Sequence, residues 1–286
     1  MKNGILVFAH NSPFVDYGLL AIISGGLAKK NLGLPVSLVT DTGTLSWLNS
    51  SGMEKKLSDV FENIIEVEYP YTENKRKLHD GFYHQTIPFI NSNRCDAYSL
   101  SPYDNTLLID SDFLIFTDRL NEYWNVESNI MIGSSINDIL DDRPGYLDKR
   151  ISEPSIPLLW ATTVMFKKNK ESEFFFKLVE FIKLNYVYFA DLFRFNPLQY
   201  RNDIAFSIAK HILSGYEVEN VYNLPSITSI LDKDIVLEID SNGKMIILMN
   251  PNDDGNYKAA KIINTDIHVM NKQSIIRNKD VLMELI

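Results

Sequence analysis

Two aspartates, Asp110 and Asp112, interrupt an otherwise apolar run in the segment NTLLIDSDFLIF (105–116). Burying an unpaired charge is costly, so either both carboxylates face solvent or a positive group lies between them. Residues i and i+2 of an extended strand point to the same side, so these two carboxylates can converge on one cation. Oxygen ligands suit hard divalent cations such as Mg²⁺ or Mn²⁺, which also bind substrate phosphates. The segment therefore predicts either a metal site or two solvated carboxylates at the end of a strand.

The elements before this acidic pair have the pattern of a parallel α/β sheet. Continuous apolar runs predict strands over residues 4–9 and 35–41, and a short helix that runs into a strand over 57–70. A helix is expected between the first two strands, with Ser12 as its N-cap and Gly33 at its end. In such sheets the ligand site lies at the carboxyl ends of the strands. Three candidate positions fall at those ends: Asn11, Asp41 and the Asp110/Asp112 pair.

The rest of the chain continues the mixed pattern. Residues 75–100 are expected to be mostly helical before the strand that ends at Asp110. The apolar pattern then predicts a strand, two helices and a hairpin, at residues 158–168, 171–184, 202–213 and 234–249. No repeat or long linker forces a domain boundary. We therefore interpret 1–286 as one α/β domain, with a nucleotide-binding half at 1–118 and an acceptor-side half at 119–286.

Composition narrows the class of protein. The chain has 286 residues and a formal net charge of −9, which argues against general nucleic-acid binding because that needs a basic face. Cys95 is the single cysteine, so an intramolecular disulfide is impossible and a secreted disulfide scaffold is excluded. No apolar stretch approaches the roughly 20 residues that span a bilayer, and the N-terminal apolar run is too short for a signal peptide. We expect a soluble, cytoplasmic protein.

The segment YDNTLLIDSDFLIF (103–116) resembles the Asp-x-Asp segment of nucleotide-sugar glycosyltransferases with the GT-A fold. It most resembles glycosyltransferase family 8, the glycogenin and lipopolysaccharide galactosyltransferase group. ILVFAHN (5–11), QYRNDIAFS (199–207) and IHVMNKQS (267–274) are similar to further elements of that family, in the same order. The resemblance implies a central, mostly parallel mixed sheet flanked by helices. It also implies metal-dependent transfer of a hexose from a nucleotide-diphosphate sugar, UDP-linked, to a hydroxyl acceptor with retention.

The resemblance assigns roles to particular residues. Asp110, Asp112 and His268 would hold Mn²⁺ or Mg²⁺. A second group is expected to contact the nucleotide and its phosphates: Ala9, Asn11, Asp41, Arg94, Ser111 and Lys272. Asp41 is included because it lies at the end of a predicted strand. A third group faces the donor sugar and the acceptor and is assigned the catalytic role: Asn202 and Asp203.

Two features depart from the family pattern. The glutamine of the acceptor motif is replaced, and Lys272 follows His268 by fewer residues than in the family. Several site residues also have a purely structural reading. Asp41 could be the N-cap of the next helix, and Asp203 could complement the dipole at a helix start. Arg94 could lie on the surface of a helix. The acceptor, a glycan, a protein or a lipid-linked hydroxyl, is not fixed by the sequence.

The sequence motifs argue against several other enzyme classes and leave two alternative functions open. No G-x-G-x-x-G or P-loop pattern follows the first strand and no G-x-S-x-G occurs, which argues against dinucleotide oxidoreductases, P-loop enzymes and α/β-hydrolases. A haloacid-dehalogenase-type phosphatase would use Asp110 as nucleophile and the pair Asp253-Asp254 for Mg²⁺, although Leu114 stands where it needs a hydroxyl residue. A non-catalytic nucleotide-sugar-binding module would keep the fold without turnover.

Overall fold

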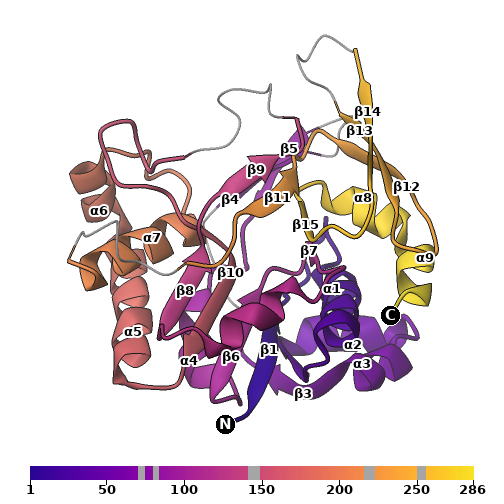
Figure 1. Ribbon diagram of the computed structural model, residues 1–286, viewed down its shortest axis with the longest axis horizontal. Helices are drawn as coiled ribbons and strands as arrows, with labels where there is room; N and C mark the ends of the chain where they lie inside the picture. Colours follow the sequence, from indigo (N-terminus) through magenta and orange to yellow (C-terminus); the bar gives the residue numbers. More distant parts are fainter. Residues whose placement is uncertain (70–74, 80–83, 141–148, 216–222, 250–255) are drawn as a thin grey trace.

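The computed structural model of the protein describes residues 1–69, 75–79, 84–140, 149–215, 223–249 and 256–286. A six-stranded mixed sheet forms its centre (Figure 1). The strands follow one another across the sheet in the order β3 (Phe61–Glu66), β2 (Val36–Thr40), β1 (Asn3–Phe8), β6 (Asn105–Ile109), β10 (Trp160–Lys167) and β8 (Ile130–Gly133). The first four are parallel, and β10 is antiparallel to both β6 and β8. The expected mixed, mostly parallel sheet is confirmed.

Helices flank this sheet. They are α1 (Tyr17–Leu32), α2 (Thr42–Ser50), α3 (Glu54–Val60), α4 (Ala97–Leu100), α5 (Lys170–Leu184), α6 (Tyr186–Phe193) and α7 (Asn202–Leu213). α1 packs against β1 and β2, while α7 packs against β10 and α5 packs against α7. The strand expected over 158–168 and the helices expected over 171–184 and 202–213 are confirmed as β10, α5 and α7.

The start of α1 differs from the expectation. The helix begins at Tyr17 with Asp16 as its N-cap, whose carboxylate accepts a hydrogen bond from the Leu19 N–H at 2.9 Å. Ser12 instead closes a turn before the helix, where its Oγ accepts from the Val15 N–H at 3.1 Å. Serine and aspartate are both good capping residues, and Asp16 is the one that directly precedes the first residue of the helix. The predicted end at Gly33 is confirmed, with φ 68° at that glycine.

The prediction of a mostly helical segment over 75–100 is wrong. The described part of this segment begins with an antiparallel pair, β4 (Lys75–His79) and β5 (His84–Pro88). Leu78 and Ile87 are buried, and burial of these isolated apolar residues outweighs a weak local helix preference. Among the described residues of this segment, only a short 3-10 helix, η1 (Arg94–Asp96), and α4 are helical.

A second sheet connects the end of β6 to the C-terminal region. Its strands lie in the order β7 (Phe113–Leu114), β15 (Ile267–Val269), β11 (Ile227–Ile230) and β9 (Ile136–Asp138). β7 is antiparallel to β15, while β15, β11 and β9 run parallel. This pairing brings β7, from the middle of the chain, together with β15, from its C-terminal part.

The remaining described elements complete the C-terminal part. A third sheet contains β12 (Ile235–Ile239), β13 (Met245–Met249) and β14 (Lys258–Ile262), and the helical elements are η2 (Arg119–Asn125), α8 (Lys272–Arg277) and α9 (Lys279–Glu284). The predicted hairpin is confirmed as β12 and β13, with φ 72° at Gly243 in the turn between them. Among the described helices, none combines the length and the apolar character needed to cross a bilayer. The division of the chain at residue 118 stays a prediction.

Candidate active site

The acidic pair lies in the turn that joins the two larger sheets. β6 ends at Ile109, and the Asp110 N–H donates to the Thr162 carbonyl of β10 at 3.0 Å. The chain then turns, with the Phe113 N–H donating to the Asp110 carbonyl at 3.1 Å, and enters β7 of the second sheet. The apolar run is therefore interrupted because it supplies strands to two different sheets. The two aspartates occupy the corner between them.

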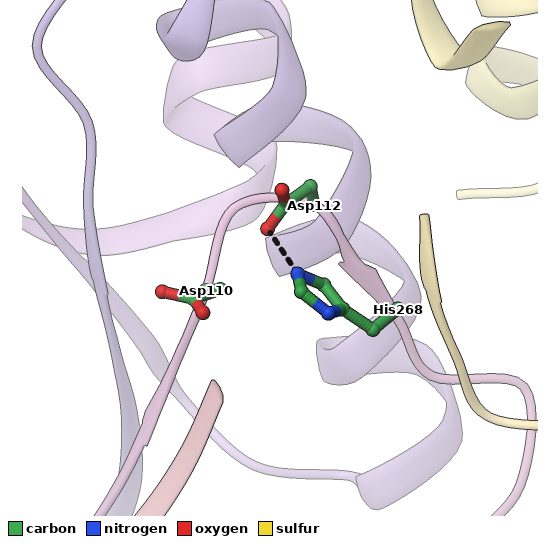
Figure 2. Close-up of side chains that lie close together, drawn as sticks. All are labelled: Asp110, Asp112 and His268. Atoms are coloured by element: carbon green, nitrogen blue, oxygen red, sulfur yellow. Dashed lines mark ion pairs between the residues drawn. The ribbon is translucent and has the colours of Figure 1, made fainter. Parts of the chain in front are cut away.

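His268 reaches this corner through strand pairing. It lies opposite Phe113 in the antiparallel pair of β15 and β7, and the Val269 N–H donates to the Asp112 carbonyl at 3.0 Å. The imidazole Nε2 lies 3.3 Å from the Asp112 Oδ1 (Figure 2). Asp110, Asp112 and His268 each offer one ligand atom within 4.8 Å of the others. The structure thus brings together the three residues predicted as metal ligands.

Lys272 is the second partner of Asp112. It opens α8, a short helix whose N-cap Asn271 accepts from the Ser274 N–H. The ammonium Nζ lies 2.5 Å from the Asp112 Oδ2, and the lysine side chain is only 5% exposed. One carboxylate therefore binds an imidazole with one oxygen and an ammonium with the other.

Arg94 is the partner of Asp110. The residue opens η1, and its Nη1 donates to the Asp110 Oδ1 at 2.7 Å. Its side chain is 4% exposed, and its Nε and Nη2 are buried without a hydrogen-bond partner in the described part of the chain. Buried guanidinium donors are costly to leave unpaired, so these two nitrogens point to a missing acceptor.

Charge and burial separate the two carboxylates. Burial raises the pKa of Asp110 above its usual range, because Arg94 only partly offsets the cost of desolvation and the charge of Asp112 adds to it. Its side chain keeps 31% exposure, so solvent in the adjoining cavity moderates that effect. For Asp112, burial acts in the same direction, but Lys272 and His268 outweigh it and hold the pKa well below its usual range. Asp112 is thus the more firmly ionised of the two.

A cavity of about 410 Å³ opens beside these residues. This volume falls within the range of small-molecule sites, roughly 300–1,000 Å³. Eight of the eleven residues assigned to the site from the sequence line this cavity. They are Asp110, Asp112, His268, Arg94, Ser111, Lys272 and the two predicted catalytic residues, Asn202 and Asp203. The cavity therefore unites most of the predicted site.

Asn202 and Asp203 lie at the start of α7. The Asn202 Nδ2 donates to the Asn91 carbonyl at 3.1 Å, while its Oδ1 is buried without a partner among the described residues. The Asp203 carboxylate accepts from Arg201 through Nε at 3.1 Å and Nη2 at 2.5 Å, and from the Ile204 N–H at 3.0 Å. Asp203 thus both carries a counter-charge and begins a helix.

Ala9, Asn11 and Asp41 do not line this cavity. Asp41 is the N-cap of α2, where its carboxylate accepts from the Thr44 N–H at 3.0 Å and the Thr44 Oγ1 at 2.7 Å, and lies 2.9 Å from the His10 Nδ1. The structure therefore gives Asp41 a capping role, and its contact with the nucleotide stays a prediction. The Asn11 Oδ1 similarly accepts from the Gly18 N–H at 2.8 Å, and Ala9 is fully buried.

Sequence reasoning missed several residues of the cavity wall. They include Tyr17, Phe89, Asn91, Trp160, Thr162, Gln199, Tyr200, Arg201, Asp232 and Met270. Arg201 lies with its guanidinium carbon 5.8 Å from the centre of the Trp160 ring. Its place directly before Asn202 and Asp203 was the available signal. Trp160 gives no such signal, because it stands at the start of an apolar strand where a core role is expected.

The phosphatase alternative gains nothing from the structure. Leu114, which stands at the position that would need a hydroxyl residue, is a buried residue of β7. Asp253 and Asp254 lie outside the described residues. The described residues give Asp110 an arginine partner and leave no observation that favours a nucleophilic role.

Comparisons with known proteins give matches to solved structures alone. No family model matches the sequence, and no curated protein matches it. Similar solved structures include the glycosyltransferase GlyE in Streptococcus pneumoniae TIGR4, with a TM-score of 0.43, 11% identity, and coverage of 79% of this chain and 45% of that chain. They also include the galactosyltransferase LgtC, with a TM-score of 0.44, 14% identity, and coverage of 73% and 70%.

Mouse xyloside xylosyltransferase 1 is similar as well, with a TM-score of 0.42, 11% identity, and coverage of 76% of this chain and 83% of that chain. The chain spans less than half of the GlyE chain, at 45%. At such identities and TM-scores the matches assign no activity or ligand to this chain, so its function has to be argued from the site.

Proposed function

We propose that the protein is a metal-dependent glycosyltransferase. It moves a hexose from a nucleotide-diphosphate sugar, UDP-linked, to a hydroxyl acceptor with retention of the anomeric configuration. One observation carries the proposal: the three candidate metal ligands share a cavity with two buried cations, Lys272 and Arg94. Metal ligands beside buried donors for an anion are what a diphosphate leaving group needs.

The donor set fits a divalent cation. Asp110 and Asp112 supply carboxylate oxygens and His268 supplies one imidazole nitrogen, a combination that suits Mn²⁺ or Mg²⁺. The His268 Nδ1 is buried without a partner in the described part of the chain, so the ring is held by β15 rather than by a second hydrogen bond. A bound cation would supply Lewis-acid neutralisation of the diphosphate.

Lys272 and Arg94 supply further positive charge as the diphosphate leaves. Both are buried in the wall of the cavity, where a fixed positive charge stabilises developing negative charge more strongly than in water. Arg94 adds two donors that are unpaired within the described part of the chain, Nε and Nη2, whose planar arrangement suits phosphate oxygens. Together they favour departure of the leaving group without a strong protein base.

Asn202 and Asp203 face the sugar and the acceptor. The Asn202 Oδ1, which has no partner among the residues that the structure describes, can accept a hydrogen bond from a sugar hydroxyl. The Asp203 carboxylate can stabilise positive charge at the anomeric carbon. Arg201 holds that carboxylate in place through two nitrogens. In a retaining transfer the leaving diphosphate itself takes the acceptor proton. Ser111 adds a small side chain beside the diphosphate, and Ala9 and Asn11 stay predicted contacts of the uracil and ribose.

Isothermal titration of UDP into metal-free protein, with and without Mn²⁺, tests the proposal. We expect UDP binding that depends on Mn²⁺ and is lost in Asp112→Asn, because the substitution removes one metal ligand. Asp59→Asn, which removes an exposed carboxylate away from the cavity, should bind as the wild type does.

UDP binding that is absent under both conditions would contradict the proposal. Metal-dependent UDP binding without hydrolysis or transfer of any UDP-hexose would support instead the non-catalytic module. A phosphatase assay that loses activity in Asp110→Asn would support the phosphatase.

A further inference from the structure

Both acidic side chains of the site already have a cation as partner. The Lys272 Nζ lies 2.5 Å from the Asp112 Oδ2, and the Arg94 Nη1 lies 2.7 Å from the Asp110 Oδ1. Lys272 and Arg94 are each 4% exposed, so bulk water does little to screen either charge. The two carboxylates and the two cations balance one another before any divalent metal is added.

This balance opposes the entry of a metal alone. A divalent cation bound to Asp110, Asp112 and His268 would place two more positive charges beside two buried cations. Repulsion between like charges a few ångströms apart is large where water is excluded. Asp112 would also have to share its charge between the metal and the ammonium that holds it. Metal binding is therefore weak while Lys272 stays on Asp112.

A diphosphate removes this obstacle because it offers Lys272 another partner. Lysine carries three donors on a flexible stem, so its ammonium can move from a carboxylate to a phosphate in the same cavity. Arg94 can bind the same anion without leaving Asp110, because its Nε and Nη2 are unpaired among the described residues. The negative charge of the diphosphate then balances the metal.

We propose that Lys272 is the internal counter-cation of Asp112 and makes metal binding depend on the diphosphate. This rests on the proposed function, since it concerns how the same site is loaded. The chain builds the device locally. His268 and Lys272 stand four residues apart, in the middle of β15 and at the start of α8, and so reach the two oxygens of one carboxylate. Lys272 is thus a positioning residue for the metal as well as a phosphate ligand.

Mn²⁺ binding to the metal-free protein, measured by electron paramagnetic resonance, tests this role in Lys272→Met and the wild type. Without UDP, we expect Lys272→Met to bind Mn²⁺ about tenfold more tightly or better, since an unscreened unit charge is removed. UDP should tighten Mn²⁺ binding strongly in the wild type and less in the variant, and by linkage Mn²⁺ should tighten UDP binding by the same factors. Titrations without protein correct for the Mn²⁺–UDP complex in solution.

Two control variants separate position from charge. Lys177→Met removes an exposed lysine that pairs with Glu173 and should leave Mn²⁺ affinity unchanged. Lys272→Arg keeps a cation beside Asp112, so its Mn²⁺ affinity without UDP should stay near that of the wild type. Far-UV circular dichroism and thermal unfolding check that each variant is folded.

The outcomes distinguish this inference from the proposed function. Mn²⁺ binding by Lys272→Met that is no tighter than by the folded wild type overturns the role of Lys272 and leaves the transferase intact. If the variant does not fold, the wild type decides, because Mn²⁺ binding that is equally tight with and without UDP also overturns it. If the wild type binds no Mn²⁺ even with UDP, both proposals fail.

Discussion

Two buried aspartates that follow parallel strands of the central sheet have very different surroundings. Asp41 follows β2 and is satisfied by its own helix start and by His10, which follows the neighbouring strand β1. Asp112 follows β6 and is held by His268 and Lys272, which come from the far end of the chain. Both carboxylates are nearly inaccessible, at 3% and 4% exposure. Burial alone therefore does not distinguish them.

The difference lies in what remains unpaired around each. At the ends of β1 and β2 (the β1–β2 edge), the His10 Nδ1 meets Asp41 and its Nε2 meets the Asn93 Nδ2 at 3.2 Å, so the ring is saturated. The Asn93 Oδ1 is a neutral acceptor that is buried there without a partner among the described residues. At the β6–β15 edge, the described residues leave the His268 Nδ1 and two nitrogens of Arg94 buried without partners. Saturated groups hold a fold together, whereas unpaired buried donors beside a cavity call for a ligand. The residues of the second edge also line the cavity, so this edge is the candidate site.

The largest expected effect tests the β6–β15 edge. Asp110→Asn should lower turnover of a UDP-hexose by about a hundredfold to a thousandfold, the range seen when one electrostatic contact to a transition state is removed. The fold should persist, because an amide oxygen can still accept from the Arg94 Nη1. Release of UDP with saturating Mn²⁺ measures turnover, and circular dichroism measures the fold. Full turnover in the variant would remove Asp110 from the metal site.

The next effect tests the β1–β2 edge, with the opposite signature. Asp41→Ala should lower the free energy of unfolding by about 3 kcal/mol, because it removes a helix N-cap and leaves the buried polar groups of Thr44 and His10 without their acceptor. Urea unfolding measures this loss, with the exposed Asp59→Ala as control. Mn²⁺ affinity of the folded variant should be unchanged. Weaker Mn²⁺ binding would mean that the two edges are coupled.

Much of the fold could be predicted because local signals agreed with it. Continuous apolar runs predicted β1, β6 and β10, and the helical pattern predicted α7 with both its ends. The segment over 75–100 failed because its strands bury single apolar residues such as Leu78 and Ile87, which leave no periodic signal. Likewise, β15 spans only Ile267–Val269, too short for a pattern to predict.

The candidate site was predictable for a different reason in each half. Asp110 and Asp112 stand out from the sequence by chemistry, since two carboxylates interrupt an apolar run. His268 and Lys272 depend on pairing between β7 and β15, a long-range contact that no local signal encodes, and they were assigned only through the family resemblance. Asp41 shows that a strand-end position also serves as a helix cap, so its assignment to the nucleotide stays a prediction.

The smallest expected effect is the pH dependence of the free energy of unfolding that His10 causes at the β1–β2 edge. Burial lowers the pKa of His10 below its ordinary value of 6.5, although its bonds to Asp41 and Asn93 oppose the shift. As the pH falls below 6.5, the unfolded chain therefore takes up a proton that the folded protein refuses. The stabilising contribution of the neutral ring is fully present above this pH. It is lost as the pH falls through the lower, folded-state pKa.

Urea unfolding of the wild type and of His10→Gln between pH 8 and pH 5 measures this contribution, since groups common to both proteins cancel in the difference. The wild type should lose more stability on acidification than the variant, because glutamine does not titrate. A wild type that loses less stability than the variant on acidification would contradict the prediction. It would mean that His10 is charged in the folded protein and that His10 and Asp41 form an ion pair. The β1–β2 edge would then be a second site of buried opposite charges, and saturation of hydrogen bonds alone would separate it from the metal site.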